Sequence, residues 1–158
     1  RAGAGDDWIT AHSPEGNRIH AGPGADHVET WSGRAGGGPG DDLLRGRLGA
    51  VVLRGGPGDD RLSGSGQADL LRGGPGDDLL LGWGGPDRLY GGPGADVLRG
   101  GAGADLLRGR GGADALFGGG GRDRLHAGPG RDRLDGGAAL NRCWPGRGAT
   151  RLRNCLLG

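Results

Sequence analysis

Aspartate residues recur at a fixed interval through most of this chain of 158 residues. Twelve consecutive nine-residue frames run from Gly37 to Trp144, and the sixth place is aspartate in all but two of them, which hold Val51 and Asn141. The aspartates are Asp42, Asp60, Asp69, Asp78, Asp87, Asp96, Asp105, Asp114, Asp123 and Asp132. Glycine fills most of the first, second and fourth places. Carboxylates, together with carbonyl groups turned by glycine, form the hard oxygen ligand set that Ca²⁺ prefers. The pattern therefore predicts a calcium site that repeats along the chain.

The elements that must position these aspartates follow from the eighth place of each frame. This place holds leucine in every frame but the last, which has Cys143. Each frame therefore reads as a six-residue turn and a three-residue strand whose middle side chain points inward. With 43 Gly and 9 Pro, the composition alone would indicate disorder. The unbroken period of nine instead predicts a solenoid.

Frames such as GGPGDDLLR and GGPGADVLR match the nonapeptide G-G-x-G-x-D-x-U-x, where U is a large apolar residue. The chain therefore resembles the repeats-in-toxin (RTX), or hemolysin-type, calcium-binding proteins. That resemblance implies an all-β fold, a right-handed parallel β-roll with two nonapeptides per turn. It also implies about eight Ca²⁺ ions, each between one loop and the loop one turn away. Besides the ten aspartates, the implied ligands are carbonyl groups of glycines such as Gly56, Gly58, Gly74, Gly76, Gly92 and Gly94.

Two nonapeptides per turn would sort the sixth places into two rows. The first row runs from Asp42 to Asp132 in steps of 18, and the second from Val51 to Asn141. Because neither Val51 nor Asn141 has a carboxylate, we expect weaker binding at the ends of the second row. The step from Asp26 to Asp42 is 16, which weakens the case for calcium near Asp7 and Asp26.

We expect one continuous domain in three parts. Residues 1–36 would form irregular N-terminal repeats and a cap, residues 37–144 the regular roll, and residues 145–158 a C-terminal cap. Cys143 takes an inward place, and Cys155 lies in the tail. Two interpretations stay open: a disulfide that folds the tail over the end of the core, or two free thiols that act as small apolar groups.

Residues on either side of each inward leucine should form two outer faces. One has an apolar centre at Leu79, Leu81, Val97, Ala115 and Phe117, either a contact surface for a second copy or neighbouring domain, or a tolerated apolar surface. The other has one arginine per turn and no acid. It would either meet a polyanion or be a solvated face balanced by the acidic loops. The net charge of +1 argues against nucleic acid as a partner.

No catalytic motif is found. The chain has no H-E-x-x-H or G-x-S-x-G segment, and without lysine it cannot form a Walker motif. His12, His20 and His27 have no zinc spacing, and no apolar run approaches the ~20 residues of a membrane span. We therefore expect a non-enzymatic calcium-binding β-roll that, as the resemblance implies, bacteria secrete and calcium folds outside the cell. Two alternatives are a C-terminal module of a secreted hydrolase and a surface-adhesion or self-assembling module.

Overall fold

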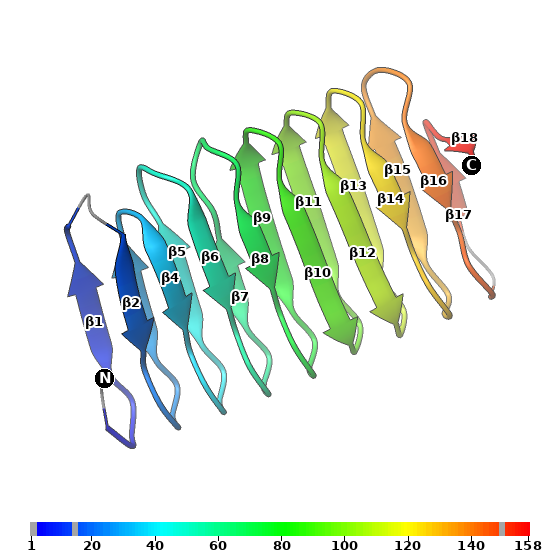
Figure 1. Cartoon of the computed structure of the whole chain (residues 1–158). Coiled ribbons are helices and arrows are strands. Elements are labelled where there is room, and N and C mark those ends of the chain that lie inside the picture. Colours follow the sequence, from blue (N-terminus) through cyan, green and yellow to red (C-terminus); the bar gives the residue numbers. More distant parts are fainter. Residues whose placement is uncertain (1–2, 14–15, 149–150) are drawn as a thin grey trace.

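The chain forms two parallel β-sheets that face each other along a solenoid, as a computed structural model shows (Figure 1). The structure describes residues 3–13, 16–148 and 151–158, and within these ranges each sheet has nine strands. Sheet A consists of β1 (Trp8–Ala11), β3 (His27–Thr30), β5 (Leu43–Gly46), β7 (Arg61–Ser63), β9 (Leu79–Gly84), β11 (Val97–Ala102), β13 (Ala115–Gly120), β15 (Arg133–Gly137) and β17 (Arg151–Arg153). Sheet B consists of β2 (Asn17–His20), β4 (Gly33–Gly36), β6 (Val51–Arg54), β8 (Leu70–Arg72), β10 (Arg88–Pro93), β12 (Leu106–Gly111), β14 (Arg124–His126), β16 (Arg142–Trp144) and β18 (Leu156–Leu157).

Successive strands alternate between the two sheets, so each strand pairs with the one that comes one full turn later. Leu62 lies beside Leu80, and Leu80 beside Leu98, a step of 18 residues. The predicted all-β parallel roll with two nonapeptides per turn is confirmed. Strands β9 to β13 are longer than the three residues expected, because their parallel ladder continues into the first glycines of the following turn.

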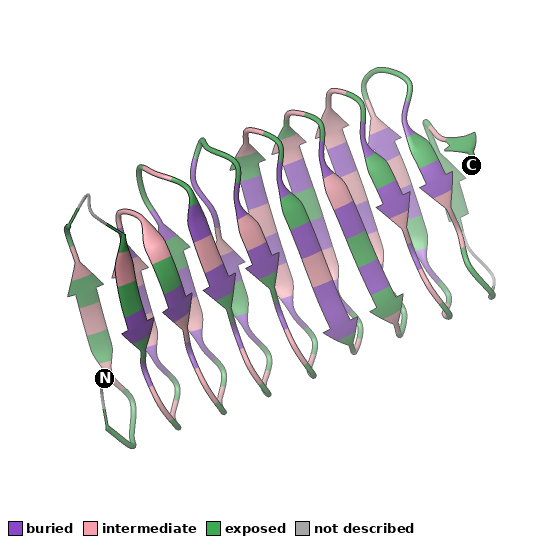
Figure 2. Ribbon diagram, in the orientation of Figure 1, coloured by how far each residue is buried: buried purple, intermediate pink, exposed green. Residues whose placement is uncertain are grey.

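The core is one inward side chain per strand. Burial alternates along the strands, with the inward leucines fully covered and their neighbours facing outward (Figure 2). The fully covered leucines are Leu44, Leu53, Leu62, Leu71, Leu80, Leu89, Leu98, Leu107, Leu116, Leu125 and Leu134. Cys143 ends the sheet B column and is also fully buried. The apolar core is therefore two single columns, a small amount of apolar area for a chain of this length.

Both ends of the chain add strands to the same two sheets. At the N-terminal end, β1 pairs with β3 and β2 with β4. Only residues 31–32 separate β3 from β4, against four residues between β5 and β6, and this shorter turn accounts for the step of 16. At the C-terminal end, β17 and β18 stack on β15 and β16, and a disulfide joins Cys143 to Cys155. Parts of the two predicted caps, residues 1–2, 14–15 and 149–150, lie outside the described residues. No helix in the described ranges is long and apolar enough to cross a bilayer.

Candidate calcium sites

One oxygen of each repeat aspartate is fixed by the backbone of the preceding turn. The backbone N–H of Asp60 donates to Oδ1 of Asp78 at 2.9 Å, and the N–H of Asp78 donates in turn to Oδ1 of Asp96 at 2.9 Å. The second row has the same ladder, for example from Asp69 N–H to Asp87 Oδ1 at 2.8 Å. Each carboxylate therefore has a fixed position and orientation inside the turn, and all ten predicted aspartates are buried.

The other oxygen of these carboxylates has no partner. In the described residues, Oδ2 is buried without a hydrogen bond in nine of the ten predicted aspartates and in Asp26. The nine are Asp42, Asp60, Asp78, Asp87, Asp96, Asp105, Asp114, Asp123 and Asp132. A buried carboxylate oxygen without a partner is strongly unfavourable unless a cation compensates it. A row of such atoms thus indicates a missing positive charge.

The pKa values of the carboxyl groups lead to the same conclusion. Burial, together with the charges of the neighbouring aspartates in the row, raises the pKa of Asp60, Asp87 and Asp96 to about 7. Hydrogen bonds from the backbone of the preceding turn act in the opposite direction but do not cancel the effect of burial. At neutral pH the unliganded rows would therefore be only partly ionised, and a bound divalent cation would favour the ionised form.

Glycine is required where one turn lies on the next. Gly74 has φ of +142° and Gly76 of +134°, and a Cβ at either residue would overlap the carbonyl oxygen of Gly56 or Gly58. A Cβ at Gly73 would overlap Oδ2 of Asp78. The turn thus holds glycine carbonyl oxygens and a carboxylate oxygen against bare backbone, where no side chain fits.

The carbonyl groups of Gly56, Gly58, Gly74 and Gly76 accept no hydrogen bond from any described residue, although the neighbouring carbonyls of Gly73 and Pro75 do. The available ligands are therefore all oxygen atoms, one carboxylate oxygen and at least two carbonyl oxygens per turn. No group of three or more His, Cys, Asp or Glu side chains in the described chain could hold a metal. Carbonyl groups must complete any coordination shell, which fits Ca²⁺ and does not fit zinc.

Two predicted ligand residues differ from the rest. Asp69 already has partners for Oδ2, because the N–H of Ser65 donates to it at 2.6 Å and the Ser65 hydroxyl lies 3.2 Å away. Serine replaces the second glycine in this frame, so this turn has a hydrogen-bond donor near the place of an ion. Gly92 lies inside β10, whereas Gly94 follows the end of the strand in the same left-handed conformation as Gly76.

Asp26 belongs to the first row, although the sequence spacing argued against it. Its N–H donates to Oδ1 of Asp42 at 2.8 Å, and its own Oδ1 accepts from Asp7 N–H at 2.8 Å. The frame AGPGADHVE and the left-handed φ of Gly22 and Gly24 carry the same signal as the regular repeats. Allowing a shorter turn on the opposite edge would have placed Asp26 in the row.

The fold and these sites define a parallel β-solenoid whose turns bind calcium. A family model confirms this description, because the RTX calcium-binding nonapeptide repeat matches residues 36–71, 54–89, 63–98, 90–125 and 117–152. These matches overlap and cover most of the chain, so the chain belongs to the family of RTX calcium-binding repeat proteins, as its frames predicted. No curated protein matches the chain.

Proposed function

We propose that this chain is a calcium-folded structural module of a secreted bacterial protein, extended and disordered where calcium is scarce and rigid outside the cell. It has no catalytic role in this proposal. The observation that supports it is the row of buried, unpartnered carboxylate oxygens, repeated every 18 residues and facing unused glycine carbonyl groups. About eight ions would fill the gaps, five in the first row and three in the second.

The thin core explains why calcium would control folding rather than merely bind. One buried leucine per strand contributes roughly 2 kcal/mol, which is of the order of the cost of fixing two residues of chain. Without a cation, the turns also bring carboxylates close together in a desolvated row. Ions that bind only the folded roll add their binding free energy to its stability.

A calcium titration followed by far-ultraviolet circular dichroism tests this proposal, with magnesium as the control. We expect a cooperative change from coil to strand with calcium alone, because Mg²⁺ requires a smaller octahedral shell and loses its water reluctantly. Isothermal titration calorimetry on the same samples gives the number of ions. A strand spectrum that persists after thorough chelation would refute the proposal.

Self-association through the outer face of sheet A is a second candidate function. Leu79 and Val97 are neighbours there, and Trp83 at the edge of this face is 62% exposed, its indole N–H bonded to Ser63 at 2.8 Å. The predicted patch is interrupted, however, because Arg99 lies between Leu81 and Phe117 and its guanidinium group stands 5.3 Å from the Phe117 ring centre. Sedimentation of wild type and Leu79→Gln in calcium distinguishes a dimer from a monomer.

A further inference from the structure

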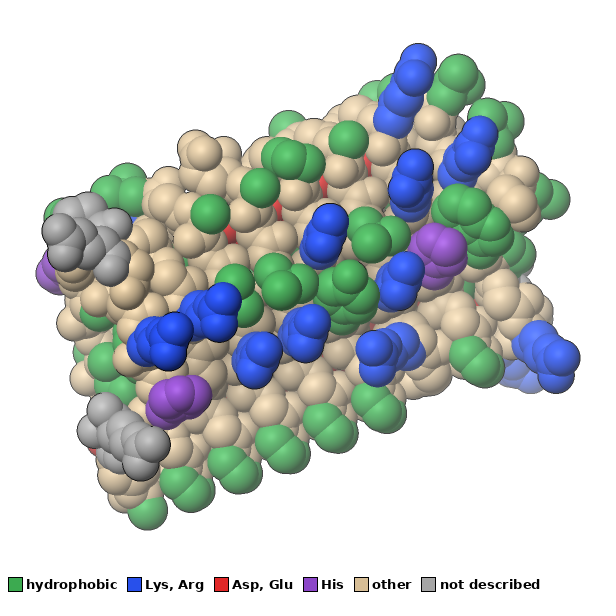
Figure 3. All heavy atoms as spheres, in the orientation of Figure 1, with side chains coloured by type: hydrophobic (Ala, Val, Ile, Leu, Met, Phe, Trp, Pro, Cys, Tyr) green, Lys and Arg blue, Asp and Glu red, His purple; other side chains and the backbone are tan. Residues whose placement is uncertain are grey.

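Sheet B exposes one arginine on each of eight consecutive strands, β2 to β16. All eight side chains are exposed and form a band along the roll (Figure 3). They are Arg18, Arg34, Arg54, Arg72, Arg88, Arg108, Arg124 and Arg142. The outward positions of these strands hold no aspartate or glutamate. The band is therefore strongly positive, although the chain has a net charge of only +1.

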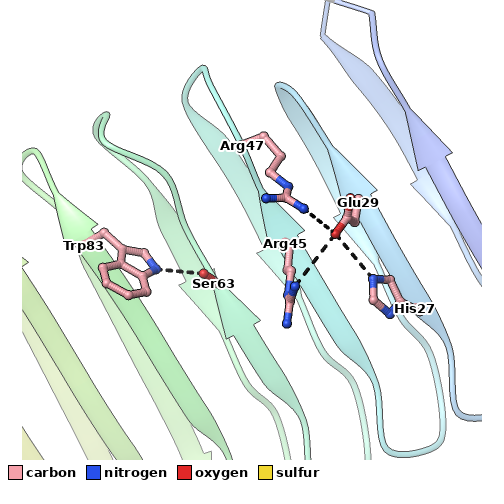
Figure 4. A network of polar contacts seen from close by, with 6 residues as sticks. All are labelled: His27, Glu29, Arg45, Arg47, Ser63 and Trp83. Atoms are coloured by element: carbon pink, nitrogen blue, oxygen red, sulfur yellow. Dashed lines mark hydrogen bonds and ion pairs between the residues drawn. The ribbon is translucent and has the colours of Figure 1, made fainter.

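The arginines of this band have no acidic partner within the chain. The ion pairs among described residues all involve Glu29 on the other sheet, where Arg47 lies 2.8 Å and Arg45 3.9 Å from its carboxylate (Figure 4). The repeat aspartates are buried and use Oδ1 within their own ladder. The acidic loops therefore do not pair with the band, contrary to the interpretation of a face balanced by them.

The pairing of the strands brings several of these positive charges close together. Arg54 is the direct neighbour of Arg72, Arg124 of Arg142, and Arg18 of Arg34. Like charges in directly neighbouring positions of a sheet reduce stability. In the middle of the band, Tyr90 lies between two arginine columns, with its ring centre 5.6 Å from Arg72 and 5.7 Å from Arg108. The arrangement lowers the stability of the sheet, so a bound anion is needed to explain it.

We propose that the outer face of sheet B binds a linear anionic polysaccharide, laid along the axis of the roll. The positive charges recur about every 4.8 Å, the distance between adjacent strands, and this is close to the length of one sugar unit in an extended chain. Eight arginines thus follow a straight line of about 34 Å. Guanidinium groups bind sulfate and carboxylate oxygens in a two-pronged geometry, which suits sugars that carry one acidic group each.

The same surface is poorly suited to other polyanions. A flat sheet face has no element that enters a groove of duplex nucleic acid, and single strands need a series of aromatic side chains, whereas Tyr90 and Trp144 are three strands apart. A membrane surface needs apolar side chains that reach beyond the charges. The exposed large apolar residues of the described chain include none from strands β2 to β16 of this sheet.

The test uses dextran sulfate, with unsulfated dextran as the matched control, and the full chain in calcium. The variant Arg72→Gln/Arg88→Gln/Arg108→Gln removes three charges from the middle of the band. The matched variant Arg61→Gln/Arg99→Gln/Arg133→Gln removes three from sheet A, where Arg99 and Arg133 flank Phe117 as Arg72 and Arg108 flank Tyr90. Binding is measured by calorimetry, and circular dichroism establishes that each variant is folded.

We expect wild type and the sheet A variant to bind dextran sulfate equally, and the sheet B variant to bind about tenfold more weakly or less, with an affinity that falls steeply with salt. Equal binding by the two variants would overturn the proposal. Tighter binding of duplex DNA, or of vesicles with anionic lipid, would refute the polysaccharide as the partner. This site requires the folded roll but not its calcium, so a chain that keeps its strands under chelation and still binds would refute only the proposed calcium dependence.

Discussion

Replacing Asp78 with asparagine would separate the charge of a repeat carboxylate from its hydrogen bond. In the structure, Oδ1 of Asp78 accepts from Asp60 N–H at 2.9 Å, while Oδ2 has no partner. Asn141 shows that an amide can take the same place, because its Oδ1 accepts from Asp123 N–H at 2.8 Å and its amide donates to Ala138 at 3.0 Å. Asp78→Asn should therefore keep the ladder and lose only the anionic oxygen.

The expected cost follows from the position of Asp78 between two gaps of the row, toward Asp60 and toward Asp96. Extracellular calcium modules have dissociation constants of about 10⁻⁴ to 10⁻³ M, so at about 10 mM calcium each ion contributes about 1.4 to 2.7 kcal/mol. Weakening both sites should cost about 3 to 5 kcal/mol of unfolding free energy. Without calcium the substitution should be neutral or stabilising, because burial and nearby charges raise the pKa of Asp78 to about 6.

Urea unfolding followed by circular dichroism, with calcium and after chelation, measures both effects. The matched control is Asp77→Asn, one residue away, exposed, and bonded through Oδ1 to Ala95 N–H at 2.7 Å. It removes the same charge outside the buried row and should change the stability by less than about 1 kcal/mol. Equal effects of the two substitutions, or an equal loss with and without calcium, would refute the role assigned to the buried oxygen.

Three further predictions concern the turns, the pH and the tail. Gly74→Ala should cost about 2 to 4 kcal/mol, because φ is +142° and the Cβ would meet the Gly56 carbonyl, whereas Gly66→Ala, with nothing within 4 Å, should cost under about 0.5 kcal/mol; equal urea midpoints would contradict this. Because burial raises the folded-state pKa of Asp60 to about 7, above an unfolded value of about 3.9, the calcium-free roll should gain stability as the pH falls from about 7 to 4, while the calcium needed for folding should increase. Thermal melts in both buffers check this, and a calcium-free roll that is more stable at pH 8 than at pH 5 would argue against it. Cys155→Ser should cost about 2 to 3 kcal/mol, with faster hydrogen exchange mainly in β16 to β18, and a reductant should have the same effect on wild type but none on the variant.

The sequence was sufficient to predict the regular part of the fold, because each place in the nonapeptide has one physical role. An aspartate at place six is buried, and a leucine at place eight is buried, in turn after turn. Period and residue type together thus predicted the sheets, the inward columns and the rows of carboxylates before any coordinates.

The remaining features depend on local exceptions that a fixed period does not represent. Asp26 joins its row because the chain shortens a turn at residues 31–32, on the opposite edge of the solenoid. Ser65 gives Asp69 a partner because one hydroxyl replaces one glycine hydrogen. Arg99 interrupts the apolar patch because the columns are read across turns, not along the chain. Each of these needs the register between strands, which is a property of the folded roll.

The uniform step of 18 residues makes the roll a mechanical series. Each turn is held only by the turn before and the turn after it, so tension applied at the two ends would load every turn equally and peel them away one at a time. Each rupture should release 18 residues, about 60 Å of contour length. The Cys143–Cys155 bond would shorten the final step, so a force-extension trace should show a regular sawtooth with one truncated tooth.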